Sequence, residues 1–245
     1  MVSACNYATP ISTYPCQGRR ENEGERLVLL LLFEIADRKH TTYLTNNTKN
    51  ENGEEMTSSM KGKVALVTGG STGIGFATAQ RFASEGSKVA IANVNAERGE
   101  AAVGKIKEAG GEAIFIQTDV SDPAQVEAMV SKVIETYGRL DYAFNNAGIP
   151  GDPGPIHMAT PENFQRVIAV NLTSVWTSMK YEIQHMMQNG GGVIINNSSA
   201  AGGRAMPGMS AYVASKFGIN GITKTAAFGV RRRRHTGELS HAGAG

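Results

Sequence analysis

The sequence has very few cysteines and no long hydrophobic run. Its two cysteines among 245 residues, Cys5 and Cys16, both lie near the N-terminus. The rest of the chain can therefore form neither a disulfide nor a thiolate metal site, which favours a reducing, cytoplasmic location. The longest apolar run, at 27–33, is much shorter than the roughly 20 residues needed to span a bilayer, and no signal-peptide cleavage pattern follows it. We expect no membrane partner and no metal site.

The chain also lacks a strong excess of charge of either sign. Its formal net charge is +2, and one run of arginines at 231–234 contributes four of the 24 basic residues. No aromatic platform or basic face accompanies this run, so we expect no nucleic-acid partner. The length suits one α/β domain or two small ones, and a hydrophobic content of 41% is sufficient for a buried core.

Residues 1–59 differ from the rest of the chain. They contain Pro10, Pro15 and a polar tract at 41–55 with little periodicity, which predicts a disordered extension. A targeting presequence is the alternative, although the many acidic residues argue against a mitochondrial one. We place an incomplete dinucleotide-binding catalytic domain at 60–227 and treat 228–245 as a separate basic tail.

From residue 63 onward, short β-rich runs alternate with segments of helical periodicity. Asp122-Pro123 and Thr160-Pro161 each combine an N-cap side chain with proline at the first helical position. This alternation predicts an α/β fold with a doubly wound parallel sheet. The predicted strands are 63–68, 88–93, 113–117, 140–145 and 192–197, and the predicted helices are 74–85, 96–109, a helix from 123, 160–188 and 210–227.

A glycine-rich turn follows the first strand and opens the first helix. It reads TGGSTGIG at 68–75, with Gly69, Gly73 and Gly75 between strand and helix. Glycine lets the backbone approach a pyrophosphate, which the free N–H groups at a helix N-terminus then bind. We therefore predict a dinucleotide site here, and the alternative is a tight connection without a ligand. The other predicted site residues in this turn are Thr68, Ser71, Thr72 and Ile74.

Asn93 ends the second predicted strand, where a dinucleotide site usually has an acidic residue for the ribose 2′-hydroxyl. Its amide can hydrogen-bond a hydroxyl but cannot repel a 2′-phosphate as a carboxylate does. No lysine or arginine stands at Thr72 or Val94 to attract such a phosphate. The choice between NAD and NADP therefore stays open, with a slight preference for NAD.

Three side chains suited to proton chemistry occur near the end of the predicted domain. Ser199 is followed by Tyr212 thirteen residues later and by Lys216 after four more. Residues four apart lie on one face of a helix, so the ammonium can lie beside the phenol and lower its pKa. The spacing of tyrosine and lysine, taken alone, also fits ordinary surface residues of a helix.

Further motifs extend this pattern: Asp119-Val120 after the third predicted strand, Asn145-Asn146-Ala147-Gly148 after the fourth, and Asn171 in the long helix. Together with the glycine turn and the serine, tyrosine and lysine, they resemble the short-chain dehydrogenase/reductase family over residues 61–227. The resemblance implies a Rossmann-type fold and hydride transfer between NAD or NADP and a secondary alcohol or ketone. It also implies a homodimer or homotetramer that pairs through the helices at 161–188 and 210–227.

The resemblance also implies a role for each catalytic residue. Tyr212 would be the general acid/base, and Ser199 would hold the substrate oxygen. Lys216 would bond the nicotinamide ribose and lower the pKa of the tyrosine. Asn171 would place a water that joins Lys216 to solvent.

The remaining motif residues would hold the cofactor. Asp119, with Val120 beside it, would meet the adenine, while Asn145, Ala147 and Gly148 would line the cofactor and steady the central strand. Ordinary structural roles are the alternatives: a bridge to helix backbone for Asn171, a loop hydroxyl for Ser199 and a turn cap for Asp119.

The resemblance ends after Ala227. The family continues into a strand resembling GIRVN, a Pro-Gly turn, a substrate-covering helix and a seventh strand, and this sequence shows none of them. Synonymous codons for 228–243, read one base later, encode SEYAAAGIRVNSVMP, so our hypothesis is a one-base frame error near Phe228. Loss of the last strands would leave the strand at 192–197 as an unpaired edge. The alternative function is therefore a truncated, inactive product that keeps at most dinucleotide binding.

Overall fold

The structure, a computed structural model, describes residues 9–10 and 60–239, the last ten of them by their backbone alone. The extension predicted at 1–59 otherwise lies outside the described residues, as does the end of the tail at 240–245. Among the described residues, no helix is long and apolar enough to cross a membrane. In the same part of the chain, no group of three His, Cys, Asp or Glu side chains is placed to hold a metal ion.

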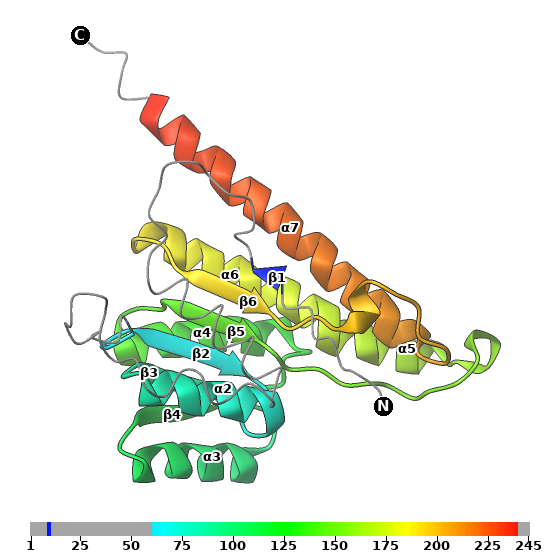
Figure 1. The fold of residues 1–245 in the computed structure, drawn as a ribbon, viewed down its shortest axis with the longest axis horizontal. Helices are drawn as coiled ribbons and strands as arrows, with labels where there is room; N and C mark the ends of the chain where they lie inside the picture. The colour runs from blue at the N-terminus through cyan, green and yellow to red at the C-terminus, as the bar shows by residue number, and fades with distance from the viewer. Residues whose placement is uncertain (1–8, 11–59, 240–245) are drawn as a thin grey trace, which may run out of the picture.

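A six-stranded sheet forms the centre of the fold (Figure 1). Its parallel strands run in the spatial order β6-β5-β2-β3-β4, so the first of them, β2, lies in the middle and the later strands are added outward on both sides. This order confirms the predicted doubly wound α/β fold, in which ligands bind at the carboxyl ends of the strands. The strands are β2 (Val64–Thr68), β3 (Lys88–Asn93), β4 (Glu112–Gln117), β5 (Tyr142–Asn145) and β6 (Val193–Asn196).

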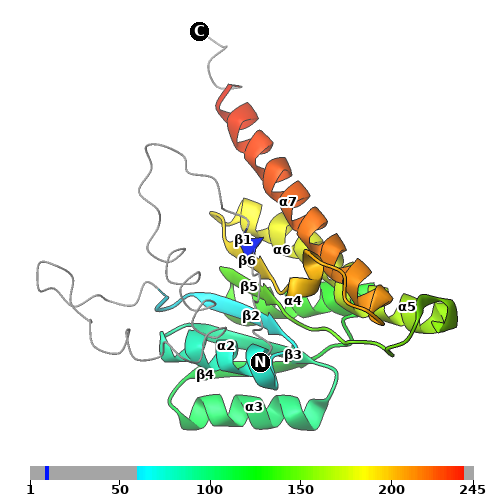
Figure 2. The same cartoon turned by 45° about the vertical axis from the view of Figure 1, so that its right-hand side comes forward.

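Helices cover both faces of the sheet (Figures 1 and 2). On one face Ala65 and Val67 of β2 join a core with α2 (Gly73–Ser84) and α3 (Ala96–Glu108). On the other face Val64 and Leu66 join a second core. Side chains alternate along a strand, so a strand covered on both faces is buried at every position, as β2 is, and its first four residues are apolar. The second core contains α4 (Pro123–Tyr137), α6 (Ser174–Gln188) and α7 (Ser210–Leu239).

Two helix starts have the caps that their sequences predict. The Asp122 side chain accepts a hydrogen bond from the N–H of Ala124 at 2.9 Å, with Pro123 in the first turn of α4. Thr160 accepts from the N–H of Asn163 at 3.2 Å at the start of α5 (Pro161–Ile168). Each cap satisfies an N–H group that has no intrahelical partner.

The long helix predicted at 160–188 is present from Pro161 to Gln188 as α5, η2 (Ala169–Thr173) and α6, but a widened turn in its middle was not predicted. The π-helical turn η2 lies between α5 and α6. A π turn bonds residue i to i+5, which widens the helix, and such turns are frequent at functional sites. Asn171 lies at the centre of this turn.

The two ends of the described chain also differ from expectation. β1 (Thr9–Pro10) pairs antiparallel with β6, so the prediction that β6 is an unpaired edge was wrong. An edge strand presents open N–H and C=O groups to which any extended segment can pair. At the other end, α7 continues to Leu239 and projects away from the sheet (Figure 1). No proline interrupts residues 228–239 and arginine is a good helix former, so the helix continues into the basic tail.

Candidate active site

The glycine turn after β2 requires each of its three predicted glycines. Gly69 and Gly73 adopt positive φ angles of 63° and 55°, which other residues rarely adopt. Gly75 is required for another reason, because a Cβ atom there would lie 2.3 Å from the carbonyl oxygen of Gly69. The turn is therefore a backbone shape that larger residues would disrupt.

The start of α2 suits an anion. Thr72 is its N-cap residue, but the threonine side chain makes no capping hydrogen bond, and the first turn contains no acidic residue. The first N–H groups of a helix lack intrahelical partners and lie at the positive end of the helix dipole. Thr72, Gly73 and Ile74 are exposed at this position. The residues present therefore fit the pyrophosphate of a dinucleotide.

Asn93, at the end of β3, is hydrogen-bonded at both ends of its amide. Its Nδ2 donates to Ser71 Oγ at 2.6 Å, and its Oδ1 accepts from the N–H of Asn95 at 3.0 Å. Ser71 is buried, so the asparagine holds the glycine turn against the end of β3. Asn93 is thus placed beside the predicted ribose site, with a neutral side chain.

Asp119 and Val120 follow β4. The Asp119 carboxylate accepts from the N–H and the hydroxyl of Ser121, at 2.9 and 2.7 Å, which is the turn-cap role that we considered as the alternative. Asp119 is exposed, and Val120 packs against the core beneath it. The contact with adenine stays a prediction for both residues.

Two asparagines join the glycine turn to the loops that follow β5 and β6. Thr68 Oγ1 accepts from the N–H groups of Asn146 and Ala147, at 2.9 and 3.2 Å. Asn146 Nδ2 donates to the carbonyl oxygens of Thr68 and Gly69, at 3.1 and 3.3 Å, and Asn146 Oδ1 accepts from Asn197 Nδ2 at 2.9 Å. The carboxyl ends of β2, β5 and β6 are therefore locked together, at the edge of the sheet where this fold binds ligands.

Tyr212 and Lys216 lie one turn apart on α7. The Lys216 Nζ atom is 5.5 Å from the centre of the Tyr212 ring and donates to the carbonyl oxygen of Asn197 at 2.7 Å. Lys216 is only 4% exposed, and this burial lowers the pKa of its ammonium to about 8. Tyr212 is partly exposed. A buried cation therefore lies beside an accessible phenol.

Ser199 begins the short helix η3 (Ala200–Gly202) after β6. Its Oγ accepts from the N–H of Ala201 at 3.2 Å, and its hydroxyl hydrogen has no acceptor among the described residues. The helix η3 packs on α7, where Asn220 Nδ2 donates to the Gly202 carbonyl oxygen at 3.0 Å. Ser198 Oγ also donates to the Lys216 carbonyl oxygen at 3.4 Å. These contacts hold the serine loop against the helix of Tyr212 and Lys216.

Asn171 is fully buried and bridges three segments. Its Oδ1 accepts from the N–H of Ile149 at 2.8 Å, and its Nδ2 donates to the Ile149 carbonyl oxygen at 2.9 Å and to Ser215 Oγ at 3.2 Å. Ile149 follows Gly148, and a Cβ atom on Gly148 would lie 3.3 Å from Asn171 Oδ1. Asn171 therefore ties the loop after β5 to α7, while its place in a water relay stays a prediction.

Sequence reasoning missed Ser215 and Asn197. Ser215 Oγ donates to the Tyr212 carbonyl oxygen at 2.7 Å and accepts from Asn171, so it joins two predicted site residues. Asn197 joins Asn146 to Lys216. A usable signal existed for both: Ser215 lies three residues after Tyr212 on a helix, and Asn197 belongs to a polar NNSS segment directly after a buried strand.

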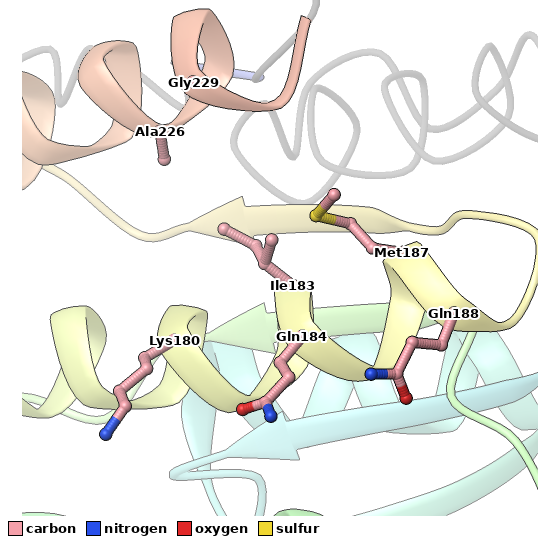
Figure 3. Close-up of a pocket in the computed structure, with 7 residues that line it drawn as sticks. All are labelled: Lys180, Ile183, Gln184, Met187, Gln188, Ala226 and Gly229. Carbon is pink, nitrogen blue, oxygen red and sulfur yellow. The ribbon is translucent and has the colours of Figure 1, made fainter. Parts of the chain in front are cut away.

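A groove of about 620 Å³ between α6 and α7 is separate from this site. Figure 3 shows Ile183 and Met187 of α6 pointing toward Ala226 and Gly229 of α7. At 1.5 Å rise per residue, Ala226 lies roughly 20 Å along α7 from Tyr212. The groove is therefore not the pocket that would receive a substrate.

Comparison with known proteins gives a consistent result. A family model described as short chain dehydrogenase matches residues 63–234, which extends past Ala227, where we expected the resemblance to end. Short chain dehydrogenase/reductase astE of Aspergillus oryzae is 45% identical over 75% of this chain and 70% of its own length. Levodione reductase of Leifsonia aquatica is 37% identical over 67% of this chain and 62% of its own length. Cyclohexanol dehydrogenase of an Acinetobacter strain is 39% identical, with shares of 70% and 68%. The chain thus spans 62–70% of the length of these relatives.

Two solved structures share the fold. A metagenomic short-chain oxidoreductase in complex with NADP has a TM-score of 0.68 and 36% identity, over 71% of this chain and 78% of that protein. NAD⁺-bound xylitol dehydrogenase has a TM-score of 0.69 and 36% identity, over 71% of this chain and 67% of that protein. One relative is therefore described with NADP and the other with NAD⁺.

The sheet order, the glycine turn and the tyrosine–lysine pair together define the class of oxidoreductases with an NAD(P)-binding Rossmann fold. Within that class, the chain belongs to the short-chain dehydrogenase/reductase family.

Proposed function

We propose that this chain transfers a hydride between a nicotinamide dinucleotide and a secondary alcohol or ketone, with Tyr212 as the general acid/base. The observation that supports this most directly is Lys216, a buried ammonium held 2.7 Å from the Asn197 carbonyl oxygen and 5.5 Å from the Tyr212 ring. Burial of a charged group costs free energy, so a buried ammonium next to a tyrosine indicates a functional site.

The residues divide the proton chemistry between them. A bound nicotinamide dinucleotide supplies the acceptor or donor of the hydride. In the direction of oxidation, Tyr212 as phenolate takes the hydroxyl proton of the alcohol while the carbinol C–H bond breaks and a C=O bond forms. Ser199 donates a hydrogen bond to the same oxygen and stabilises the charge that develops on it. Lys216 favours the phenolate and hydrogen-bonds the ribose, and Asn171 steadies the loop opposite α7 and places the relay water.

We propose NAD as the preferred cofactor. Ser71, Thr72 and Val94 are the neighbours of Asn93 in the predicted ribose site, and none is a cation that would pair with a 2′-phosphate. The Ser71 hydroxyl and the Asn93 amide suit a ribose hydroxyl. Asp119 and Val120 would line the adenine side, and Ala147 and Gly148 the side near the nicotinamide, while Asn145, which is 3% exposed and bonded to Glu182 and Asn196, would steady the strand behind them.

The substrate that we propose is apolar and alicyclic. Ile156 and Met158 are 77% and 70% exposed, on the loop that follows β5, and Met206 is 39% exposed on the loop before α7. The two loops are joined by a hydrogen bond from the Gly154 N–H to the Gly208 carbonyl oxygen, at 2.9 Å. Exposed apolar side chains of this size on adjoining loops suit a hydrophobic ligand. The name of one relative, cyclohexanol dehydrogenase, points to the same class of substrate.

We also propose that two copies pair through α6 and α7. Trp176 and Met187 on α6 and Phe228 on α7 are 54%, 46% and 65% exposed, so the two helices that the resemblance implies as the pairing surface carry large apolar side chains at the surface. Sedimentation equilibrium measures the mass of the assembly, and a monomer at all concentrations would refute pairing.

The test of the catalytic proposal compares two tyrosine variants. Tyr212→Phe should retain NAD binding, measured by quenching of intrinsic fluorescence or by calorimetry, but should lose turnover of cyclic alcohols about 10²–10⁴-fold. Tyr181→Phe is the matched control, because it removes a hydroxyl that bonds Glu127 on the surface at 2.8 Å. Its turnover should be unchanged.

Two outcomes would contradict the proposal in different ways. Turnover by Tyr212→Phe at the rate of the unaltered chain would refute the role of the tyrosine. Binding of NAD by the unaltered chain with no turnover of any alcohol or ketone would favour the second candidate, a dinucleotide-binding product without activity. Sequencing the transcript across Phe228 tests whether a frame error is the cause.

A further inference from the structure

A buried carboxyl group lies beneath the site and takes no part in the chemistry proposed above. Glu182 of α6 is fully buried, as are its neighbours Asn145, Asn196 and Thr223, which are 3%, 1% and 2% exposed. Asn145 is the last residue of β5 and Asn196 the last residue of β6. The cluster therefore lies directly behind the two loops that contain Asn146 and Asn197.

The orientation of each amide in this cluster follows from its partners. Asn196 Nδ2 lies 3.0 Å from Met179 Sδ and 2.8 Å from Thr223 Oγ1. A thioether sulfur only accepts, so the nitrogen of Asn196 must face it. The oxygen of Asn196 therefore faces Asn145, whose Nδ2 donates to it at 3.0 Å and to Glu182 Oε2 at 3.0 Å.

This arrangement leaves two buried oxygens without a donor. Glu182 Oε1 and Asn145 Oδ1 have no hydrogen-bond partner among the described residues. Buried acceptors without a donor are costly, and an ionised carboxylate without a counter-ion is more costly still. Both oxygens belong to the same pair of side chains, which already share the bond from Asn145 Nδ2 to Glu182 Oε2.

Among the described residues, no charged side chain offsets the burial of Glu182. Burial raises the pKa of its carboxyl to about 7, opposed only by the hydrogen bond from Asn145. Three titratable side chains near Glu182 bond to other residues: Tyr181 to Glu127, His185 to Asn189 and Lys216 to Asn197. The structure describes the following titratable side chains on the elements packed around Glu182, with α7 taken as far as Gly229: Glu127, Lys132, Glu135 and Tyr137 on α4, Asp141 on the approach to β5 and Tyr142 within it, Lys180, Tyr181 and His185 on α6, and Tyr212, Lys216 and Lys224 on α7.

We propose that Glu182 is a positioning residue that carries a proton in the folded protein and forms a cyclic acid–amide pair with Asn145. In this pair Asn145 Nδ2 donates to Oε2, and the protonated Oε1 donates to Asn145 Oδ1. The pair and the Asn145–Asn196 bond fix the ends of β5 and β6 relative to each other. They thereby hold Asn146 and Asn197, which connect the glycine turn to Lys216.

The proposal predicts how stability depends on pH. The pKa of Glu182 is higher in the folded state than its usual value of 4.5, so between these two values the folded protein binds more protons than the unfolded chain. Stability is then full at low pH, falls as the pH rises from about 4.5 to about 7, and changes no further above that. Loss of the proton leaves a charge between β5 and β6, which should also weaken dinucleotide binding, an effect that rests on the proposed function.

The decisive variant is Glu182→Gln, whose amide supplies a donor and an acceptor at every pH. Urea unfolding at pH 5 and pH 8 gives the ratio of the unfolding constants of the unaltered chain and the variant. That ratio should rise on the order of 100-fold between the two pH values. Glu135→Gln, an exposed glutamate on α4 with 67% of its side chain exposed, is the matched control and should show no such rise. A ratio for Glu182→Gln that does not change with pH overturns the proposal.

A second measurement uses the unaltered chain and needs no dinucleotide. At pH 6 exposed carboxyl groups are ionised, so an infrared band from a protonated carboxyl must come from a buried one. The proposal expects such a band, which disappears as the pH is raised to 8.5, and its absence at pH 6 refutes the proposal even where Glu182→Gln does not fold. For binding, the affinity for NAD should fall more steeply between pH 6 and pH 8.5 in the unaltered chain than in Glu182→Gln, in which the titration of Lys216, with its pKa of about 8, still contributes. Failure of both proteins to bind NAD, with the infrared band present, would count against the proposed function and not against the acid–amide pair.

Discussion

Replacement of Lys216 by methionine distinguishes what the buried ammonium does to the stability of the fold from what it does for turnover. Lys216 is 4% exposed, and its burial lowers the pKa of the ammonium from 10.5 to about 8. At 1.36 kcal/mol per pH unit, this lowering corresponds to about 3 kcal/mol of unfavourable burial of the charged form. Methionine has similar length, has no charge and fills irregular space well.

The hydrogen bond that the ammonium makes offsets part of this cost. Its bond to the Asn197 carbonyl oxygen, at 2.7 Å, involves a charged donor and contributes about 1.5–3 kcal/mol. We therefore expect Lys216→Met to change the free energy of unfolding at pH 7 by no more than about 2 kcal/mol. Turnover should nevertheless be lost, because the variant has neither the charge beside Tyr212 nor the donor to the ribose.

The pH dependence gives a sharper test, and its sign is opposite to that for Glu182. The folded pKa of Lys216 lies below the unfolded value, so between pH 8 and pH 10.5 the unfolded chain binds more protons. Over this range the unaltered chain should gain about 3 kcal/mol of stability relative to Lys216→Met. Urea denaturation at pH 7.5 and pH 10 measures the difference. A loss above 4 kcal/mol at pH 7, or a difference that does not vary with pH, would refute this reasoning.

Two further substitutions test the cofactor site. Gly75→Ala should lower the free energy of unfolding by about 2 kcal/mol and weaken NAD binding at least about tenfold, because its Cβ would lie 2.3 Å from the Gly69 carbonyl oxygen. Gly104→Ala on α3 is the control, since its Cβ meets nothing within 4 Å, and it should stabilise the protein by about 0.5–1 kcal/mol; equal effects of the two changes in thermal denaturation would contradict this account. Asn93→Asp should raise the ratio of NAD to NADP affinity about tenfold or more, because a carboxylate repels the 2′-phosphate. Calorimetric titration with both cofactors measures that ratio, and an unchanged value would remove Asn93 from the ribose site.

Local rules were sufficient to predict most of the fold. The strand at 88–93 was predicted with its observed bounds, and the helix starts at Pro123 and Pro161 followed from capping side chains and proline. These features depend on residues within one turn or one strand of each other. The π turn at Ala169–Thr173 and the pairing of Thr9–Pro10 with β6 were not predicted, because they depend on contacts between segments far apart in the chain.

The sequence predicted the site residues that belong to a motif, but not the residues that hold those motif residues in place. The spacing of Tyr212 and Lys216 indicated their shared helix face, and the structure places them 5.5 Å apart, nitrogen to ring centre. Glu182, in contrast to Asn197, has no local signature, because a glutamate in an amphipathic helix is common on surfaces. Its burial and its bond to Asn145 appear only when α6 packs on the sheet.

The π turn that contains Asn171 has a consequence for how this protein can change. A π turn holds one more residue than an α turn, so deletion of a single residue within Ala169–Thr173 would restore a regular helix while α5 and α6 keep their faces toward the core. Such a deletion would remove a wide, less favourable turn, and the helix would tolerate it. Asn171, however, would lose the direction that takes its side chain to Ile149 and Ser215. A deletion that makes this helix regular would therefore cost the site the bridge that Asn171 makes between the loop after β5 and α7.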